Sequence, residues 1–384
     1  MTAGVPAEVL GAVRDELART GAEVGPQQVA RALRRRGRPV GDAEVLAVHD
    51  ALRRDVLGAG PLDALLALPD VTDVLVNGAA EVWVERGDGL EPSGVTFDSE
   101  DAVRRLAQRL AAMGGRRLDD ASPYVDLRLS DGTRFHAVLA PIARPGTLIS
   151  LRVPPRRSFD LAAIRAAGAI SEDGETLLRR VVAARLAFLV SGGTGSGKTT
   201  LLGALLSLVD PRDRVVLVED ASELRPTHPH VVALEARPAN LEGAGEVTLR
   251  TLVRQALRMR PDRLVVGEVR GAEVVDLLAA MNTGHEGGCG TVHANSAADV
   301  PARIESLAMA AGLSRGAAAS QLASAVDLVV HVDRADAGRR QVRELAVLVR
   351  SGDGVEARTA VRFGRDGSAA LGPGVERLEE LLAR

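Results

Sequence analysis

The segment LAFLVSGGTGSGKTTLLGALL, residues 186–206, decides the fold. An apolar run at 186–190 leads into a glycine-rich turn, and a second apolar stretch follows from Lys198. The turn fits the pattern G-x-x-x-x-G-K-T, in which glycines let backbone N–H groups point inward at a phosphate chain. A strand before the turn and a helix after it are the context that this pattern requires, and the helix N-terminus adds partial positive charge. The segment therefore predicts a phosphate site between a strand and a helix, with a glycine-rich turn formed by chance as the alternative.

Two side chains of this turn would carry its chemistry. Lys198 should reach the β- and γ-phosphates of a nucleotide, and the Thr199 hydroxyl should bind Mg²⁺. Lys198 is the only lysine, so the other 47 of the 48 basic residues are arginines. A dinucleotide-binding loop fits less well, because the third glycine lacks its required spacing. The expected nucleotide-binding residues are Gly192, Gly193, Thr194, Gly195, Ser196, Gly197, Lys198, Thr199 and Thr200.

The composition bounds the class of protein. A chain of 384 residues is expected to form two or three domains, and 46% apolar with 26% charged residues is typical of a soluble globular protein. The net charge of −3 gives no overall field that would attract nucleic acid or anionic lipid. We expect neither a membrane helix nor a secretory signal. The single cysteine, Cys289, cannot form an internal disulfide, which fits a reducing compartment.

The first 55 residues are expected to form helices. Apolar residues recur there at helical spacing, as at Val9, Val13 and Leu17. The arginine-rich stretch at 34–38 is interpreted as a solvated helix end, with contact to nucleic acid or lipid as the alternative.

The rest of the chain divides at Pro154-Pro155-Arg156-Arg157, which interrupts both helical and strand patterns. Residues 56–150 are expected to form a mixed α/β domain, residues 151–160 a linker, and residues 161–384 a larger α/β domain. The smaller domain should contain strands at 74–76 and 82–84, a helix at 101–113, and a hairpin with strands at 127–129 and 135–139.

In the larger domain, apolar strands alternate with helices, which predicts a mostly parallel sheet with helices on its faces. The strands are expected at 186–190, 215–218, 264–266, 328–332 and 345–349. The helices are expected from 198, at 247–259, at 272–281 and from 375.

Acidic residues follow two of the expected buried strands. Glu219 and Asp220 follow the strand at 215–218, and Glu268 follows the strand at 264–266. Carboxylates at the ends of neighbouring strands could hold the water of a Mg²⁺ ion and orient an attacking water molecule. The alternative is that either acid caps a helix or pairs with a surface arginine.

A glycine-rich loop between His285 and His293 is a second candidate feature. An imidazole could donate a hydrogen bond to a phosphate oxygen, and the glycines would let the loop move with the nucleotide state. The segment could instead be a zinc site that includes Cys289, but it lacks the C-x-x-C pairs of structural zinc sites.

Two groups of arginines accompany these motifs. Arg250, Arg254 and Arg258 recur at fourfold spacing and are interpreted as one solvated helix face. Another three could supply transition-state charge to a nucleotide from a different domain or subunit, with ordinary surface arginines as the alternative. These are Arg128, Arg134 and Arg152.

The order of the motifs resembles a known family. The phosphate loop is followed by EDASEL at 219–224, RPDRLVVGEVRG at 260–271, MNTGHEG at 281–287 and TVHAN at 291–295. This order resembles the secretion ATPase superfamily of type II and type IV secretion and pilus assembly. In its terms the motifs are the Walker A, Asp box, Walker B and His box motifs.

The N-terminal half narrows the resemblance. LGAGPL at 57–62 and VTDVLVNG at 71–78 resemble the branch that serves tight-adherence (Tad, or Flp) pili, also named conjugal-transfer ATPases. The tetracysteine zinc module of some type II relatives is absent from the sequence. Glycines and a cysteine at 288–290 depart from the family pattern and put the packing of the His loop in question.

The resemblance implies an α/β fold with a RecA-like P-loop NTPase motor domain, a smaller α/β N-terminal domain, a flexible linker and an N-terminal helical segment. It implies a homo-hexameric ring at the cytoplasmic face of the inner membrane. Glu268 would be the Walker B acid acting through Mg²⁺ and water, Glu219 the Asp-box acid, and His293 the phosphate contact. Arg128, Arg134 and Arg152 would face the nucleotide from the N-terminal side.

The function expected from these motifs is an ATP-hydrolysing motor, with ATP and Mg²⁺ bound, that drives a Tad/Flp-type pilus or a related secretion system. Its partner would be an inner-membrane platform protein, and no direct nucleic-acid contact is expected. The alternatives are a conjugative or competence-type DNA-transfer ATPase and a non-catalytic, nucleotide-gated scaffold.

Overall fold

The computed structural model describes residues 9, 12–13, 16, 25–35, 41–42, 44–49, 58–86, 89–154, 159–239, 244–284, 286–334, 339–364 and 366–384. The contacts divide the chain into two compact units, Met1–Pro155 and Arg156–Arg384. Most of the proline-arginine break and most of the arginine-rich stretch at 34–38 lie outside the described residues, as does His285.

The start of the chain contains helix α2 (Pro26–Arg34), and residues 44–49 are also helical. Proline begins α2 at a position where its missing N–H costs nothing. Apolar side chains of these two segments and Val13 form a small core of their own, which comprises Val13, Val29, Ala32, Leu33, Val45 and Val48.

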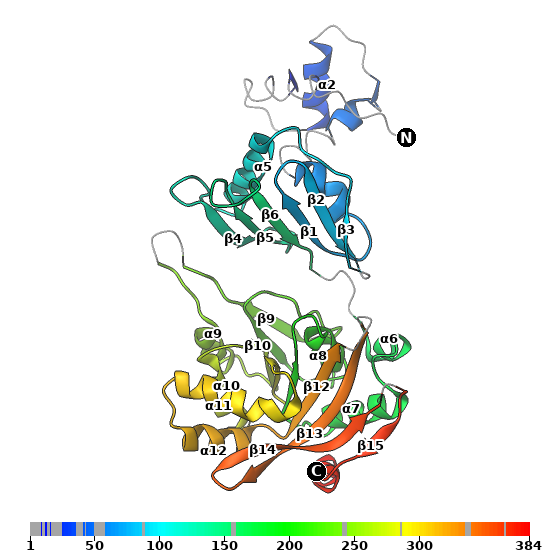
Figure 1. The fold of residues 1–384 in the computed structure, drawn as a ribbon, viewed down its shortest axis with the longest axis vertical. Coiled ribbons are helices and arrows are strands. Elements are labelled where there is room, and N and C mark those ends of the chain that lie inside the picture. Colours follow the sequence, from blue (N-terminus) through cyan, green and yellow to red (C-terminus); the bar gives the residue numbers. More distant parts are fainter. Residues whose placement is uncertain are drawn as a thin grey trace. The chain divides into compact units, whose positions relative to one another are not determined.

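The first unit contains a six-stranded sheet in which every pairing is antiparallel (Figure 1). The strand order is β3-β2-β1-β6-β5-β4. One face of the sheet packs against helix α5, so residues alternate between buried and exposed along the strands. The elements are η1 (Gly60–Leu62), α4 (Asp63–Leu66), β1 (Val71–Asn77), β2 (Glu81–Arg86), β3 (Gly89–Pro92), α5 (Glu100–Met113), β4 (Tyr124–Arg128), β5 (Arg134–Val138) and β6 (Leu148–Arg152).

The second unit is built on a nine-stranded sheet in the order β15-β14-β13-β12-β7-β11-β10-β8-β9. The strands from β12 to β9 in this order are parallel, and β13 to β15 extend the sheet antiparallel. The strands are β7 (Phe188–Gly192), β8 (Val215–Glu219), β9 (Val231–Glu235), β10 (Arg263–Val269), β11 (Cys289–His293), β12 (Leu328–Arg334), β13 (Arg340–Ser351), β14 (Gly354–Phe363) and β15 (Ala369–Leu371).

Helices cover both faces of this sheet (Figure 1). One core joins the strands to α6 (Leu161–Ala166), α7 (Glu172–Ala183), α8 (Lys198–Leu206) and α13 (Val375–Leu382). The other joins them to α9 (Leu249–Ala256), α10 (Glu273–Met281), α11 (Val300–Ala310) and α12 (Arg315–Ala325). Successive residues of β8 and β10 alternate between the two cores, which is why these strands are uninterrupted apolar runs.

The predicted α/β class with a mostly parallel sheet is confirmed, but the region around Cys289 differs from the expectation. Instead of lying in a glycine-rich loop, Cys289–His293 forms strand β11 between β7 and β10. A Cβ on Gly290 would lie 2.7 Å from the carbonyl oxygen of Val266. Because glycine lets the two backbones approach, the glycines that suggested a loop are compatible with a central buried strand.

The expected linker also begins later than residue 151. Strand β6 runs to Arg152, and Leu151 is fully buried in the core of the six-stranded sheet. Leu151 and Arg152 therefore belong to the sheet and not to the linker. Strand β9 and helices α7, α11 and α12 were not anticipated from the sequence.

Candidate nucleotide site

The functional candidates of the second unit gather at one edge of its sheet. Parallel strands end on the same side, so the carboxyl ends of β7, β8, β10 and β11 lie together. His293 is in register with Gly192, the first residue of the phosphate loop. Glu219 ends β8, and Glu268 lies one residue before the end of β10.

The phosphate loop joins β7 to α8, as the sequence predicts. Gly197 precedes α8 with φ of +93°, a left-handed conformation that glycine adopts without steric cost. A Cβ on Gly192 would lie 2.2 Å from the carbonyl oxygen of Val332, whereas a Cβ on Gly193 would meet nothing within 4 Å. Gly192 thus packs directly against β12, whereas Gly193 has free space where a side chain would be.

Lys198 lies over this loop with its ammonium group buried against it. Its Nζ donates hydrogen bonds to the carbonyl oxygens of Gly192 at 3.1 Å and Gly193 at 2.8 Å. Burial lowers the pKa of Lys198, while the carboxylates of Glu268 and Glu223 raise it. Among the described residues, the hydrogen-bond partners of this buried cation are loop carbonyls, which it could exchange for phosphate oxygens.

Glu268 is the centre of a charged cluster beside Lys198. Its Oε2 accepts hydrogen bonds from Arg270, including one from Nε at 2.6 Å, and its Oε1 lies 2.5 Å from His293 Nε2. Arg270 also lies 3.7 Å from Asp220. The structure therefore brings the expected Walker B acid and His-box histidine into direct contact.

The pKa of His293 is lowered, chiefly by burial and by the nearby Lys198 ammonium group, although Glu268 opposes this. The neutral imidazole is thus favoured around neutral pH. A neutral ring keeps one N–H donor and one acceptor, which suits a hydrogen-bonding contact to a reacting group.

Glu219 is placed differently from Glu268. It is almost fully buried, and its Oε1 accepts hydrogen bonds from the backbone N–H groups of Glu223 at 3.0 Å and Leu224 at 2.9 Å. Burial raises the pKa of Glu219 to about 7. The geometry makes Glu219 the support of the turn that follows β8.

The same turn presents Glu223, a residue to which the sequence interpretation gave no role. Glu223 is exposed, and its charge acts on both Lys198 and Arg270. Its position four residues after Glu219 was the only available signal. Arg270 was likewise quoted in a motif without a role, although it is the main ionic partner of Glu268.

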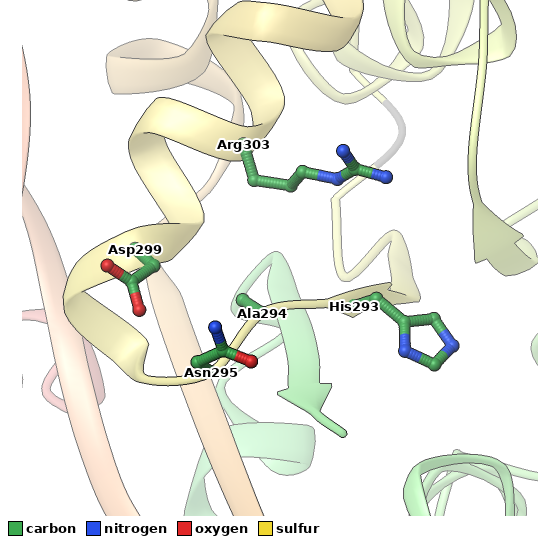
Figure 2. Close-up of a pocket in the computed structure, with 5 residues that line it drawn as sticks. All are labelled: His293, Ala294, Asn295, Asp299 and Arg303. Atoms are coloured by element: carbon green, nitrogen blue, oxygen red, sulfur yellow. The ribbon is translucent and has the colours of Figure 1, made fainter. Parts of the chain in front are cut away.

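A pocket of about 280 Å³ opens beside His293. It is lined by His293, Ala294, Asn295, Asp299 and Arg303. Figure 2 shows the Arg303 side chain extending from α11 alongside the segment that carries His293. Arg303 contributes to lowering the pKa of His293, so its charge reaches the phosphate-loop edge.

The three N-terminal arginines form a row in the first unit. Arg128 is in register with Arg134, and Arg134 is in register with Arg152. Residues directly opposite on neighbouring strands point to the same face, so the row crosses β4, β5 and β6 on one face. Arg152 Nε donates to Asp73 at 3.0 Å, and an Arg134 nitrogen lies 3.5 Å from Asp126. The structure thus brings the predicted arginines together.

The arginines of α9 do not form a purely solvated face. Arg250 and Arg254 both donate to Asp276 on α10, each at 2.7 Å. Arg258 donates to the carbonyl oxygen of Arg254 at 2.7 Å. The interpretation as a solvated face was therefore incomplete, because fourfold spacing also matches an acid on the neighbouring helix.

The zinc alternative can be compared with the described part of the chain. There, no group of three or more His, Cys, Asp and Glu side chains lies close enough to hold a metal ion, and His285 lies outside that part. Cys289 is fully buried, and burial raises the pKa of its thiol to about 12. A protonated thiol is a poor metal ligand.

Across the described residues, no helix has the length and apolar content to span a membrane.

Comparison with known proteins identifies the family. The family model described as "Type II/IV secretion system protein" matches residues 55–367. A Mycobacterium tuberculosis (strain ATCC 25618 / H37Rv) protein named as a conjugal transfer protein is 57% identical over 341 residues, covering 86% of this chain and 97% of its own. The conjugal transfer protein TrbB of Rhizobium radiobacter is 32% identical over 289 residues, covering 73% of this chain and 85% of its own.

A solved structure supports the fold independently. The pilus retraction motor PilT with bound ADP matches with a TM-score of 0.54 and 20% identity, covering 76% of this chain and 84% of that one. The chain belongs to the type II/IV secretion ATPase superfamily. Its second unit has the RecA-like fold of that superfamily.

Proposed function

We propose that this chain is an ATP-hydrolysing motor. The observation that carries the proposal is the convergence of Lys198, Glu268 and His293 at the edge of the sheet where the phosphate loop opens. A chance cluster of surface ion pairs would not explain why Lys198 is buried and donates hydrogen bonds to the carbonyl oxygens of its own loop. The ammonium group of Lys198 could instead bind the anionic oxygens of a nucleoside triphosphate, which are stronger acceptors than the loop carbonyls.

The residues divide the work of hydrolysis in this proposal. Loop N–H groups and Lys198 hold the phosphates, and residues 192–200 form the cradle. Thr199 and, through water, Glu268 offer the oxygen ligands that Mg²⁺ prefers, which fits this donor set to the ion. Bound Mg²⁺ would neutralise charge on the β- and γ-phosphates. Glu268, with Glu223 as a second acid, would orient the attacking water.

His293 and the arginine row would complete the site. His293 Nε2 lies 2.5 Å from Glu268 Oε1 in this structure, and in the proposal the imidazole would exchange that contact for a phosphate oxygen. Arg128, Arg134 and Arg152 would supply positive charge to the transition state from the N-terminal unit of the same or a neighbouring subunit. A homo-hexameric ring is the assembly that would place such a row beside each nucleotide.

The machine that the motor serves is proposed to be a Tad/Flp-type pilus or a related secretion system at the cytoplasmic face of the inner membrane. A platform protein in that membrane would receive the motion. The names of the relatives favour a second candidate, an ATPase of conjugal transfer. DNA-stimulated turnover would support that candidate and count against the pilus motor.

The test of the motor is Mg²⁺-dependent phosphate release by the purified chain, with Lys198→Ala as the matched variant. We expect turnover that disappears in the variant. A wild-type chain that binds ATP and releases no phosphate, even when assembled on lipid with its partner, would instead support the nucleotide-gated scaffold. Sedimentation with ATP and Mg²⁺ tests the ring, and a persistent monomer would contradict it.

A further inference from the structure

Strand β12 lies beside the phosphate loop, and its residues have no role in the proposed hydrolysis. Strand β7 lies between β11, which carries His293, and β12. β12 runs parallel to β7, with Leu328 to His331 opposite Phe188 to Ser191. The chain therefore leaves β12 at the same edge at which β7 enters the loop, and β13 returns from that edge antiparallel.

Two arginines stand where this hairpin meets the loop. Arg334 ends β12, Arg340 begins β13, and the two are directly opposite each other in register. Arg340 Nε donates a hydrogen bond to the carbonyl oxygen of Gly195 at 3.1 Å. A Cβ on Gly195 would lie 3.8 Å from a terminal nitrogen of Arg334, and a Cβ on Gly197 would lie 3.1 Å from Cδ of Arg340. Both side chains thus approach the loop itself.

The charges on the two sides of the loop differ. On the β11 side, the guanidinium of Arg270 is paired with Glu268 and lies near Asp220. On the β12 side, Arg334 and Arg340 are exposed, and neither is in an ion pair with another described residue. The bond to Gly195 uses one of the five N–H donors of the Arg340 guanidinium. Two like charges directly opposite each other on neighbouring strands repel, and an anion bound between them would relieve that repulsion.

We propose that Arg334 and Arg340 form a second wall of the nucleotide site and bind the polyphosphate of a nucleoside di- or triphosphate within the same subunit. The inference rests on the proposed nucleotide-binding function and extends it to the β12–β13 side. A guanidinium fork matches two phosphate oxygens, and phosphates are the nearest anions that a nucleotide in this loop would offer. Arg340 also ties the loop to the hairpin through Gly195, so one residue contacts both loop and ligand.

The experiment is equilibrium binding of ADP to the purified full chain by calorimetry, comparing wild type with Arg340→Gln and Arg334→Gln. Each variant should bind ADP about tenfold more weakly, because each loses a charge-assisted contact to phosphate. The control is Arg377→Gln, which removes an equal exposed charge paired with Glu380 on α13 and should bind ADP like the wild type.

A second measurement separates contact with phosphate from mere shaping of the loop. Affinity for ADP should fall with added salt more steeply in the wild type than in Arg340→Gln, and Arg340→Lys should recover part of the affinity. Equal salt slopes, or affinities within twofold of the wild type in both glutamine variants, would overturn the inference. If Lys198→Ala still abolishes binding in that case, the proposed nucleotide site survives and only the second wall fails. A wild-type chain that binds no ADP would overturn both.

Discussion

The two sheets of this protein present their functional candidates in different ways. In the nine-stranded sheet Glu219, Glu268 and His293 lie at or next to the carboxyl ends of parallel strands that are buried on both faces. In the six-stranded sheet, Arg128, Arg134 and Arg152 are terminal residues of antiparallel strands and lie side by side on one face. A strand end is visible in a sequence as an apolar run that stops at a polar residue. A row across strands is visible only once the register is known.

This difference between the two sheets implies that their candidate residues contribute unequally to ATP turnover. The edge of the nine-stranded sheet holds the groups that would touch the reacting phosphate, whereas the arginine row would add charge from a second unit. Substitutions at the edge should therefore have the larger effects on turnover. The following predictions go from the largest expected effect to the smallest.

Glu268→Gln should reduce ATP turnover by roughly 10²–10⁴-fold while ATP still binds, because a neutral amide cannot act as a base for the attacking water. The measurement is phosphate release under saturating ATP, together with ATP binding by calorimetry. The same measurements on Glu223→Gln show how much each acid contributes to orienting the attacking water. Near-normal turnover in Glu268→Gln would show that the edge does not hold the reacting groups.

Arg134→Gln should lower turnover by about 10–100-fold, since it removes one charge-assisted contact to the transition state. Arg134 is the central residue of the row, with Arg128 and Arg152 on either side. The matched control is Arg104→Gln on α5, which breaks an ion pair with Asp120 and should leave turnover unchanged. If the two variants behave alike, the row is ordinary surface charge.

Glu219→Gln should stabilise the protein at pH 8 but not at pH 4. Because burial raises the folded-state pKa of Glu219 from its ordinary 4.5 to about 7, the unfolded chain loses this proton first as pH rises. The contribution of Glu219 to the free energy of unfolding is fully present below about pH 4.5 and is lost as the pH rises through about 7. The glutamine avoids that loss and keeps an oxygen for the N–H groups of Glu223 and Leu224.

Thermal unfolding across this pH range checks the effect. We expect a difference of about 3 kcal/mol between Glu219→Gln and the wild type at pH 8. A difference that does not vary with pH would mean that Glu219 is already charged in the folded state.

Asp276→Asn should have the smallest effect, a loss of roughly 1 kcal/mol of stability with little change in turnover. The carboxylate joins Arg250 and Arg254 of α9 to α10, and both arginines are partly exposed, so solvent screens the pairs. Chemical denaturation measures the change. A large loss of turnover would show that the α9–α10 contact bears on the nucleotide edge.

Much of the second unit could be predicted from the sequence for a local reason. The phosphate loop, the strands around it and the positions of Lys198, Thr199 and Glu268 all follow from apolar runs and glycine spacing within short segments. The error around Cys289 also has a local origin. Glycines that suggest a loop look the same when they allow close approach between central strands, as Gly290 does beside Val266.

The difference in burial between Glu219 and Glu223 could not be predicted, because one ends an apolar strand and the other lies four residues beyond it. Burial separates them, since the carboxylate of Glu219 turns inward to its own backbone while Glu223 stays exposed. Burial depends on what packs over the turn. Gly267 on β10 contributes here, since a Cβ at that position would lie 2.7 Å from Glu219 Cγ.

By itself, then, the sequence determined the phosphate-binding loop, the alternating α/β order of the second unit and the family to which the chain belongs. These depend on residues close together along the chain. Only the tertiary structure decided the arginine row, the contact between Glu268 and His293, and the approach of Arg334 and Arg340 to the loop. Each of these depends on the order and register of strands far apart in the sequence, which many distributed packing contacts set together.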